Sequence, residues 1–283
     1  MIPKYDDMDL TLLTRRQAEL KDLLQMICVD TFFLHSDVFK TNLFIGSSID
    51  RKTILNSHID LLHGILTGSN LWFPAFNYQF PKIKDYNVQS TVCEVGPLPE
   101  HFRKEKAQWR TLDPIFSVCG TGDNPSLTFP RNTITAFDDE SIFAKLVNKK
   151  AGLLFYGAEF SSATIIHYAE RLSIQPYRYD KIFSGSITTN NSSYQVNYIY
   201  HVRPMGYRLE YAWCKLLKDL QIEGICSSLT SNIVHVMRAD ILVQYWMERL
   251  SIDPLYFLDE DSKKWVIPKL DKLGRRFELQ DFE

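Results

Sequence analysis

The sequence is short of cysteine, of glycine-rich loops and of net charge, and each shortage excludes a class of protein. Its five cysteines are odd in number and widely spaced, with no C-x-x-C pair, so neither a disulfide framework nor a zinc site is indicated. The patterns G-x-G-x-x-G and G-x-x-x-x-G-K-S/T are absent, which removes the best signals of nicotinamide dehydrogenases and P-loop enzymes. The hydrolase patterns H-E-x-x-H and G-x-S-x-G are absent as well.

The charge and hydropathy patterns argue for a small-molecule site. The formal net charge is −2 at pH 7, so there is no basic excess to neutralise the phosphates of a nucleic acid. The apolar stretches are too short to span a bilayer, and the first residues, MIPKYDDMDL, lack the apolar core of a signal peptide. We therefore expect a cytoplasmic protein that binds neither nucleic acid nor a membrane.

Hydrophobic periodicity predicts an α/β fold, a single domain over 1–283 in which helices flank a central mixed β-sheet. We expect an N-terminal helix within 1–29 and a core within 30–180 that opens with the strand, helix, strand order of a βαβ unit. Strands are predicted at 31–35, 70–76, 115–119, 152–156 and 194–202, and helices at 53–66, 97–106, 139–148, 162–171, 206–220 and 237–250, before a charged tail.

The segment 110–117, RTLDPIFS, places an acid beside a proline at the entry to a predicted strand. Asp113 has two interpretations there. In one, its carboxylate accepts hydrogen bonds from neighbouring backbone amides in a turn. In the other, it is an acid held at a strand end, where α/β folds bind their ligands.

The segment 164–170 follows an apolar strand and carries Thr164, His167 and Glu170 at three-residue spacing. On a helix, this spacing brings the three side chains near one face. His167 is then either a base oriented by Glu170 or a partly buried histidine that Glu170 satisfies. At the end of the first predicted strand, His35 and Ser36 likewise form either a turn or part of a site.

Together these segments resemble the aminoglycoside 3-N-acetyltransferase family over residues 30–175. The family patterns are H-S-S after the first strand, then P-T-F-T, V-G-x-L-x-E-x-x-R, R-S-x-H-P-x-x-S, G-x-x-S-P-x-x-x-L, and L-L-L-G followed by T-x-x-H-x-x-E. No single pattern is specific, but this chain has related segments in the same order. They are HSD at 35–37, PAFN at 74–77, VGPLPEHFR at 95–103, RTLDPIFS at 110–117, the element at 138–146, LLFYG at 153–157 and TIIHYAE at 164–170.

The resemblance implies the fold of that family and its reaction. An acyl group would move from acyl-coenzyme A, either acetyl-CoA or a longer acyl-CoA, to a primary amine, without a covalent enzyme intermediate and without a metal. By the same resemblance, the coenzyme would contact the tip of the first strand and two of the later motifs. The cofactor-binding residues expected on this basis are His35, Ser36, Thr111, Ser117 and Thr164.

One departure from the family concerns the base. Where the family carries its catalytic histidine, this chain has Asp113. An unperturbed aspartate has a pKa of about 3.9, against about 6.5 for histidine, and is the weaker base at neutral pH. We expect Asp113 to hold the amine, His167 to take its proton and Glu170 to orient His167, and the alternative is Asp113 as the base, with its pKa raised by burial. The predicted acceptor-binding residues are Phe76, Asn77, Arg110 and Tyr168.

The chain also departs from the family at Asp37, Ala75 and Asn77. The RTLDPIFS variant at 110–117, the Asn77–Tyr78 continuation and the aromatic content resemble members that acylate a nucleotide-linked amino sugar in surface-polysaccharide synthesis. A dTDP-linked aminodeoxyhexose is an example of such an acceptor, and the acyl group is acetyl or larger, such as hydroxybutanoyl. A diphosphate needs cations nearby. The candidates are Arg103, Arg110, Arg171 and Arg178.

Three alternatives stay open. The first is an aminoglycoside-modifying resistance enzyme, and the second is a non-catalytic module of the same fold that binds coenzyme A or another ligand. The third, a metal hydrolase built from His35, Asp113 and His167, is weaker because no ligand pair occurs at tight spacing. For the segment 181–283 we expect either the acceptor pocket or the subunit contact of a homodimer.

Overall fold

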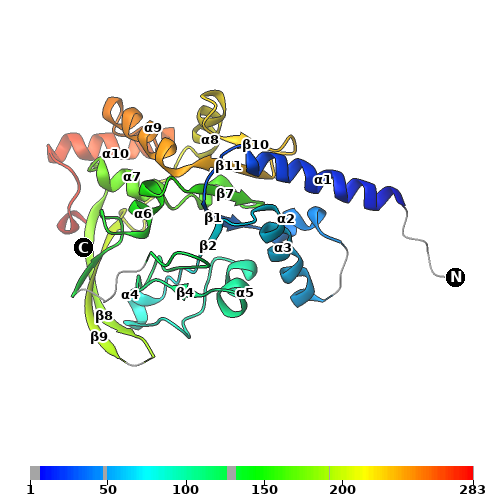
Figure 1. Ribbon diagram of the computed structural model, residues 1–283. Helices are drawn as coiled ribbons and strands as arrows, with labels where there is room; N and C mark the ends of the chain where they lie inside the picture. Colours follow the sequence, from blue (N-terminus) through cyan, green and yellow to red (C-terminus); the bar gives the residue numbers. More distant parts are fainter. Residues whose placement is uncertain (1–6, 47–49, 126–131, 191, 283) are drawn as a thin grey trace.

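A computed structural model describes residues 7–46, 50–125, 132–190 and 192–282, so residues 1–6 of the predicted N-terminal segment lie outside the described residues. The protein has a seven-stranded central sheet with helices on its faces (Figure 1). From one edge to the other, the strands are β10 (Ser227–Ser228), β11 (Val234–Arg238), β7 (Gly152–Tyr156), β1 (Thr31–Ser36), β2 (Asn70–Pro74), β5 (Val118–Gly120) and β4 (Trp109–Arg110).

The central sheet is mixed, as predicted. β1 runs parallel to both β2 and β7, whereas β11 and β5 run antiparallel to their neighbours β7 and β2. Pro74 is the last residue of β2, where its missing N–H group costs no ladder hydrogen bond. The predicted fold class, a mixed sheet flanked by helices, is therefore confirmed.

The strands β1 and β7 end at the same edge of the sheet, because they are parallel and His35 pairs with Phe155. Gly157 follows β7 with a φ of +79°, and a Cβ atom there would lie 2.3 Å from the backbone oxygen of Asp37. Only glycine permits this approach of the two loops. The tips of β1 and β7 are thereby brought together, and the site described below lies at this edge.

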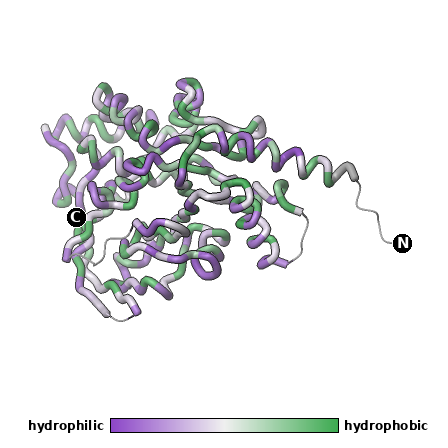
Figure 2. Tube along the Cα trace, viewed as in Figure 1, coloured by the Kyte–Doolittle hydropathy of each residue, from purple (hydrophilic) through white to green (hydrophobic). Residues whose placement is uncertain are grey.

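The side chains of β1 alternate between two apolar cores, one on each face of the sheet. Phe32 and Leu34 belong to one core, and Phe33 belongs to the other. Figure 2 shows polar and apolar residues alternating along α1, as expected of an amphipathic helix. Within the described ranges, no helix is both long enough and apolar enough to cross a membrane. The first core is covered by α1 (Asp7–Gln25), α3 (Arg51–Ile65) and α5 (Pro97–Glu105), and the second by α6 (Ile142–Asn148), α7 (Ile166–Leu172), α8 (Trp213–Ile222) and α9 (Ala239–Ile252).

A second sheet, which we did not predict, supplies side chains to the site. Its strands, in order, are β3 (Asp85–Asn87), β8 (Tyr179–Thr188), β9 (Ser193–Val202) and β6 (Thr133–Thr135). β9 confirms the antiparallel strand predicted at 194–202. It forms with β8 a long hairpin that extends to one side of the central sheet (Figure 1). The hairpin carries Tyr200 on β9, and Arg178 lies immediately before β8.

Two features of the C-terminal third were predicted only in part. The helix predicted at 206–220 begins only at Trp213, because the backbone before it bonds elsewhere, with Ala212 N donating to Phe257 O at 2.8 Å. The charged tail contains a further helix, α10 (Glu260–Leu273), which is capped by Asp259 and packs through the buried Val266. We did not predict α10 because its few apolar residues are separated by charged ones, so the sequence shows no clear helical periodicity there.

Two predicted elements near the site are shifted. The strand predicted at 115–119 starts only at Val118, because the residues before it form a turn. The helix predicted at 162–171 is divided into a 3-10 turn and α7, which starts at Ile166. The remaining short elements are α2 (Val38–Thr41), η1 (Asn42–Phe44), α4 (Phe80–Ile83), η2 (Phe160–Ser162) and η3 (Leu279–Asp281).

Candidate active site

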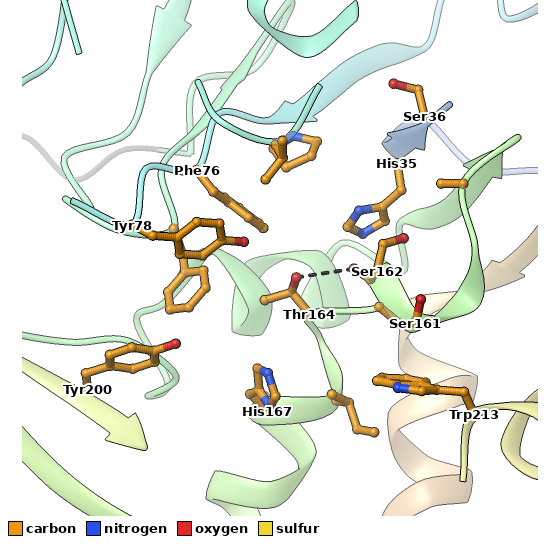
Figure 3. A pocket seen from close by; sticks show the side chains of 16 residues that line it. His35, Ser36, Phe76, Tyr78, Ser161, Ser162, Thr164, His167, Tyr200 and Trp213 are labelled. Atoms are coloured by element: carbon orange, nitrogen blue, oxygen red, sulfur yellow. Dashed lines mark hydrogen bonds between the residues drawn. The ribbon is translucent and has the colours of Figure 1, made fainter. Parts of the chain in front are cut away.

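A cavity of about 250 Å³ lies at the edge of the sheet where β1 and β2 end (Figure 3). β1 contributes His35 and Ser36, the residues after β2 contribute Phe76, and 158–167 forms the wall that follows β7. A wider groove of about 730 Å³ adjoins this cavity. His167 lies at the junction, because it belongs to the set that lines both spaces. That set is Tyr78, Ser161, His167, Tyr200 and Trp213.

His167 and Glu170 form a close pair, one turn apart on α7. The Nδ1 atom of His167 lies 2.8 Å from Oε2 of Glu170, as the three-residue spacing predicts. Glu170 is fully buried, whereas the side chain of His167 keeps 21% of its surface exposed. Nε2 of His167 makes no hydrogen bond within the described part of the chain. The ring therefore has one nitrogen held by the carboxylate and the other available.

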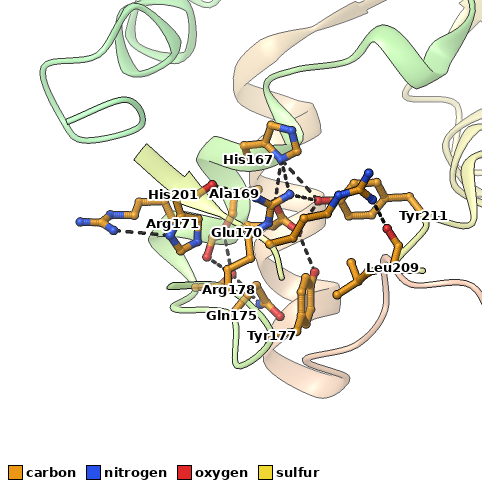
Figure 4. Close-up of polar contacts among 12 residues, drawn as sticks. His167, Ala169, Glu170, Arg171, Gln175, Tyr177, Arg178, His201, Leu209 and Tyr211 are labelled. Atoms are coloured by element: carbon orange, nitrogen blue, oxygen red, sulfur yellow. Dashed lines mark hydrogen bonds and ion pairs between the residues drawn. The ribbon is translucent and has the colours of Figure 1, made fainter. Parts of the chain in front are cut away.

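Glu170 is held ionised by a network that the sequence did not suggest (Figure 4). Tyr177 Oη and Tyr211 Oη donate to its Oε1 atom at 2.8 and 2.7 Å, and Arg178 Nε lies 2.6 Å from Oε2 in a buried ion pair. Burial by itself would raise the pKa of this carboxyl, but Arg178 and the hydrogen bonds outweigh it and lower the pKa to about 2. Glu170 is thus a carboxylate at any working pH.

The same network determines which nitrogen of His167 carries the proton. Nη2 of Arg178 lies 3.0 Å from His167 Nδ1, but it also contacts Tyr211 Oη, which can accept its hydrogen. Because Glu170 is an acceptor only, we infer that His167 Nδ1–H donates to it. The lone pair of Nε2 is then directed away from the carboxylate. Burial, together with the nearby Arg178 charge, lowers the pKa of His167 to about 4, so the ring is neutral at pH 7.

Three of the five predicted cofactor-binding residues line the cavity: His35, Ser36 and Thr164. Thr164 Oγ1 donates to the Ser162 carbonyl at 3.2 Å (Figure 3). The hydroxyl oxygen of Ser36 is buried and has no hydrogen-bond partner in the described structure.

Thr111 and Ser117 do not line the cavity. The Thr111 hydroxyl accepts a hydrogen bond from Val118 N at 2.9 Å, and Ser117 Oγ donates to the Ala75 carbonyl at 2.6 Å. Both side chains satisfy buried backbone between β2, β4 and β5. In this structure the two hydroxyls serve the fold, and the structure does not bring them to the cavity.

Of the four predicted acceptor-binding residues, only Phe76 lines the cavity. Asn77 bonds to the Val92 carbonyl and to Gln79 N, and Tyr168 is buried and lines neither space. Arg110 donates to three backbone carbonyls and to Ser117 Oγ. Asn77 and Arg110 thus satisfy the backbone of buried loops in this structure.

Asp113 lies in a turn and accepts hydrogen bonds from neighbouring backbone amides, which is the first of the two interpretations given above. Its Oδ1 atom accepts from Ile115 N at 2.9 Å, from Phe116 N at 2.6 Å and from Tyr198 Oη at 2.9 Å. The carboxyl lines neither the cavity nor the groove. Burial raises its pKa to about 6 in spite of these hydrogen bonds. Asp113 therefore supports the loop that carries Phe116 into the cavity wall, and the geometry does not support its predicted contact with the amine.

Asp113→Asn is expected to leave kcat within about threefold of wild type, because the amide oxygen can still accept the two backbone hydrogens. The raised pKa of Asp113 also makes its ionised form unfavourable in the folded state, so the carboxyl's contribution to stability is full below pH 4 and is lost as the pH rises through about 6. The variant should lack this pH dependence. Denaturant unfolding at pH 5 and pH 8, with thiol-release kinetics, checks both points. A large loss of kcat in a folded variant would show that Asp113 takes part in the reaction.

The other predicted cations are also engaged in the fold. Arg171 contacts Asp180, Arg103 pairs with Glu100 at 2.7 Å, and Arg178 pairs with Glu170. In the described part of the chain, no group of three or more histidine, cysteine or acidic side chains is placed to hold a metal ion.

The groove residues Tyr78, Tyr200 and Trp213 were missed. A single aromatic residue is most often part of a core, and no local spacing connects these three.

A family model described as aminoglycoside 3-N-acetyltransferase matches residues 69–250, which is more than half of the chain. A sequence comparison with curated proteins gives no match. The structure of AAC-IIIb in its binary complex with CoASH is similar to this chain with a TM-score of 0.68 and 16% identity, covering 85% of this chain and 96% of that chain.

Two further solved structures show the same fold at low sequence identity. AAC-VIa bound to sisomicin has a TM-score of 0.65 and 15% identity, covering 85% of this chain and 97% of that chain. The YokD protein from Bacillus subtilis has a TM-score of 0.63 and 16% identity, covering 83% of this chain and 98% of that chain. At these identities, the similarity establishes the fold.

Proposed function

The chain belongs to the aminoglycoside 3-N-acetyltransferase family and is a coenzyme A-dependent N-acyltransferase, and we propose that its acceptor is the amine of a nucleotide-linked amino sugar. The single observation that carries this choice of acceptor is the chemistry of the groove beside His167. The acyl donor is acetyl-CoA or a longer acyl-CoA. The segment 181–283 supplies much of the groove, in keeping with its proposed role as the acceptor part of the chain.

The junction at His167 supports a direct transfer between the two substrates. In this proposal the thioester lies in the cavity beside His35 and Ser36, and the amine enters from the groove. The amine nitrogen of the acceptor attacks the thioester carbonyl carbon, and His167 Nε2 takes the proton from that nitrogen. When the carbon–sulfur bond breaks, the thiolate takes up a proton, so the products are an amide and coenzyme A thiol. Glu170 keeps His167 in the tautomer that accepts the proton.

The groove carries aromatic rings and cationic side chains, with one carboxylate among its described lining residues, Glu210. Glu170 balances the charge of Arg178, and Glu210 Oε1 lies 3.8 Å from Arg203 Nη1, so the two carboxylate partners offset two of the cations and the groove keeps an excess of positive charge through Lys181. Lys181 Nζ lies 5.6 Å from the centre of the Phe183 ring. A diphosphate is attracted to such cations and a nucleobase can stack on the rings, whereas a polycationic drug is repelled.

An aminoglycoside is the second candidate acceptor. The family description and the neighbour bound to sisomicin favour it, and these comparisons support it more directly than they support a nucleotide-linked sugar. The non-catalytic module is disfavoured by the intact pairing of His167 with Glu170 at the junction of the two spaces. A homodimer stays a prediction, which sedimentation of the chain checks.

Thiol release is the direct test of the acceptor. The chain is incubated with acetyl-CoA or a longer acyl-CoA and with a panel of dTDP-linked amino sugars and aminoglycosides. Under the proposal, kcat/KM is highest with a nucleotide-linked sugar. Efficient turnover of aminoglycosides with none of the nucleotide-linked sugars would select the second candidate.

Lys181→Glu and Arg203→Glu are each expected to raise KM for the nucleotide-linked acceptor by about tenfold, because reversing a charge near a diphosphate costs about 1–2 kcal/mol at a solvated surface. KM for acetyl-CoA should not change. The matched control is Lys264→Glu, an exposed lysine on α10 outside the groove. Equal effects of all three variants would show that only the overall charge matters and would contradict the proposed contact.

A further inference from the structure

His35 is a buried histidine whose ring nitrogens have no hydrogen-bond partner among the described residues. It lies one residue before the end of β1 and is 6% exposed. Its ring stacks on Phe155 at 5.1 Å between centroids, with an interplanar angle of 15°, and meets Phe33 edge-on at 5.0 Å. Neither ring nitrogen makes a hydrogen bond with any described residue, although the side chain lines the cavity (Figure 3).

The ring nitrogens of His35 do not belong to the fully enclosed side-chain atoms that lack a partner, so they are reached from the cavity. A polar group with no protein partner at a cavity wall is placed to pair with a ligand there. An apolar ring would satisfy the packing between Phe33 and Phe155 equally well. The imidazole is therefore suited to a ligand in the cavity.

We propose that His35 is a second catalytic residue, whose ring N–H group donates a hydrogen bond to the thioester carbonyl oxygen as that oxygen gains negative charge. This inference rests on the proposed acyl transfer. It assigns different tasks to the two histidines of the cavity. His167 accepts the proton of the amine, and His35 stabilises the negative charge on the thioester carbonyl oxygen.

The surroundings of the two rings account for this division. His167 has the Glu170 carboxylate on Nδ1, which favours an imidazolium formed during the reaction, while burial and Arg178 keep the resting ring neutral. His35 has no charged partner, and burial lowers its pKa to about 3, so it stays a neutral imidazole with one N–H group. Its aromatic neighbours fix the ring, and a donor that is already fixed needs no reorganisation during the reaction.

The electron and proton balance of the step is complete without another reactant. As the bond from the amine nitrogen to the carbonyl carbon forms, the carbonyl π pair moves onto oxygen, to which His35 donates. The pair returns when the carbon–sulfur bond breaks and the thiolate leaves. The amine proton passes to His167 Nε2 and then to the thiolate. His35 ends the cycle with the proton that it had at the start.

Two variants separate a donor from a packing residue. His35→Phe keeps an aromatic ring between Phe33 and Phe155 but removes the donor, and it should lower kcat by about 10²–10³-fold with KM for acetyl-CoA nearly unchanged. His35→Gln keeps a donor and should recover part of this loss. A His35→Phe enzyme that is folded by circular dichroism and as fast as wild type overturns the inference, and so does a variant in which only KM rises.

The closing experiment observes the contact directly, without an amine. Infrared difference spectra of bound acetyl-CoA, labelled with ¹³C at the carbonyl, should show the C=O stretch at lower frequency in wild type than in His35→Phe, because a hydrogen bond to oxygen weakens the C=O bond. An enzyme that acylates amines but shows the same band in both proteins overturns the His35 inference alone. A shifted band in a wild type that acylates no amine overturns the proposed function alone.

Discussion

His167→Ala is expected to lower kcat by about 10²–10⁴-fold, the usual contribution of a positioned general base, while KM for acetyl-CoA stays near that of wild type. The reason is the geometry at the junction of the two spaces. Nδ1 is bound to Glu170, and no other described residue bonds to Nε2, which is left to take the amine proton. Thiol-release kinetics at pH 7 measure the effect. His63→Ala, at an exposed histidine on α3 outside both spaces, is the matched control and should be as active as wild type.

The pH profile distinguishes a base from a residue that only shapes the cavity. Burial and Arg178 lower the pKa of His167 to about 4, so its neutral, proton-accepting form is fully populated above about pH 5. Wild-type kcat should therefore be flat between pH 6 and 8 and should fall as the ring is protonated on the acid side. The residual activity of His167→Ala should lack this limb. If the variant kept the acid limb of wild type, another group would be the base.

The pairing of His167 with Glu170 could be predicted from the sequence, because the geometry of a helix fixes which residues close in sequence lie side by side. Three-residue spacing on a helix is enough to place His167 beside Glu170, and the parallel strands are enough to bring the tips of β1 and β7 together. The partners of Glu170 were not accessible in the same way. Arg178 precedes β8 and Tyr211 precedes α8, and no spacing along the chain indicates that both reach α7.

The polar residues of the loops show a different limit. Thr111, Ser117, Arg110 and Asn77 carry the groups that ligand sites use, but they bond to the backbone of loops that happen to be buried. A sequence motif records the residue type and not the direction of the side chain. Whether a hydroxyl faces a ligand or satisfies a carbonyl depends on the burial of a neighbouring loop, and that is decided by tertiary packing.

The second sheet could not be predicted for a related reason. Two of its strands, β3 and β6, have three residues each, which is too short for an alternating pattern to be recognised. They are strands because the long hairpin of β8 and β9 offers its edges to them. The aromatic side of the groove follows from this hairpin, so the feature that separates the two candidate acceptors was not visible in the motifs.

Glu170→Gln is expected to damage both turnover and stability. The amide can offer an N–H group to His167 Nδ1, which favours the tautomer with its proton on Nε2, and a wrong tautomer in a comparable histidine–carboxylate pair costs up to about 10⁴-fold in kcat. The change also leaves the buried Arg178 without its counter-charge, which typically costs about 3–5 kcal/mol. Thiol release and denaturant unfolding at pH 7 measure the two effects.

The stability loss should depend on pH in a defined direction. Because the folded-state pKa of Glu170 is lowered from 4.5 to about 2, its ionised form stabilises the fold fully above pH 4.5, and this contribution is lost as the pH falls towards 2. The difference in unfolding free energy between wild type and Glu170→Gln should therefore be constant from pH 6 to 8 and shrink below pH 4.5. A difference that grew on acidification would contradict the buried carboxylate.

Glu100→Gln is the matched control, because Glu100 is also paired with a largely buried arginine, Arg103, and also has its pKa lowered to about 2, but it lies on α5 outside the cavity and the groove. It should lose stability while keeping kcat near wild type. Equal losses of kcat in both variants would mean that Glu170 acts only through folding. A loss of kcat confined to Glu170→Gln, at a pH where both variants are folded, assigns to Glu170 the orientation of His167.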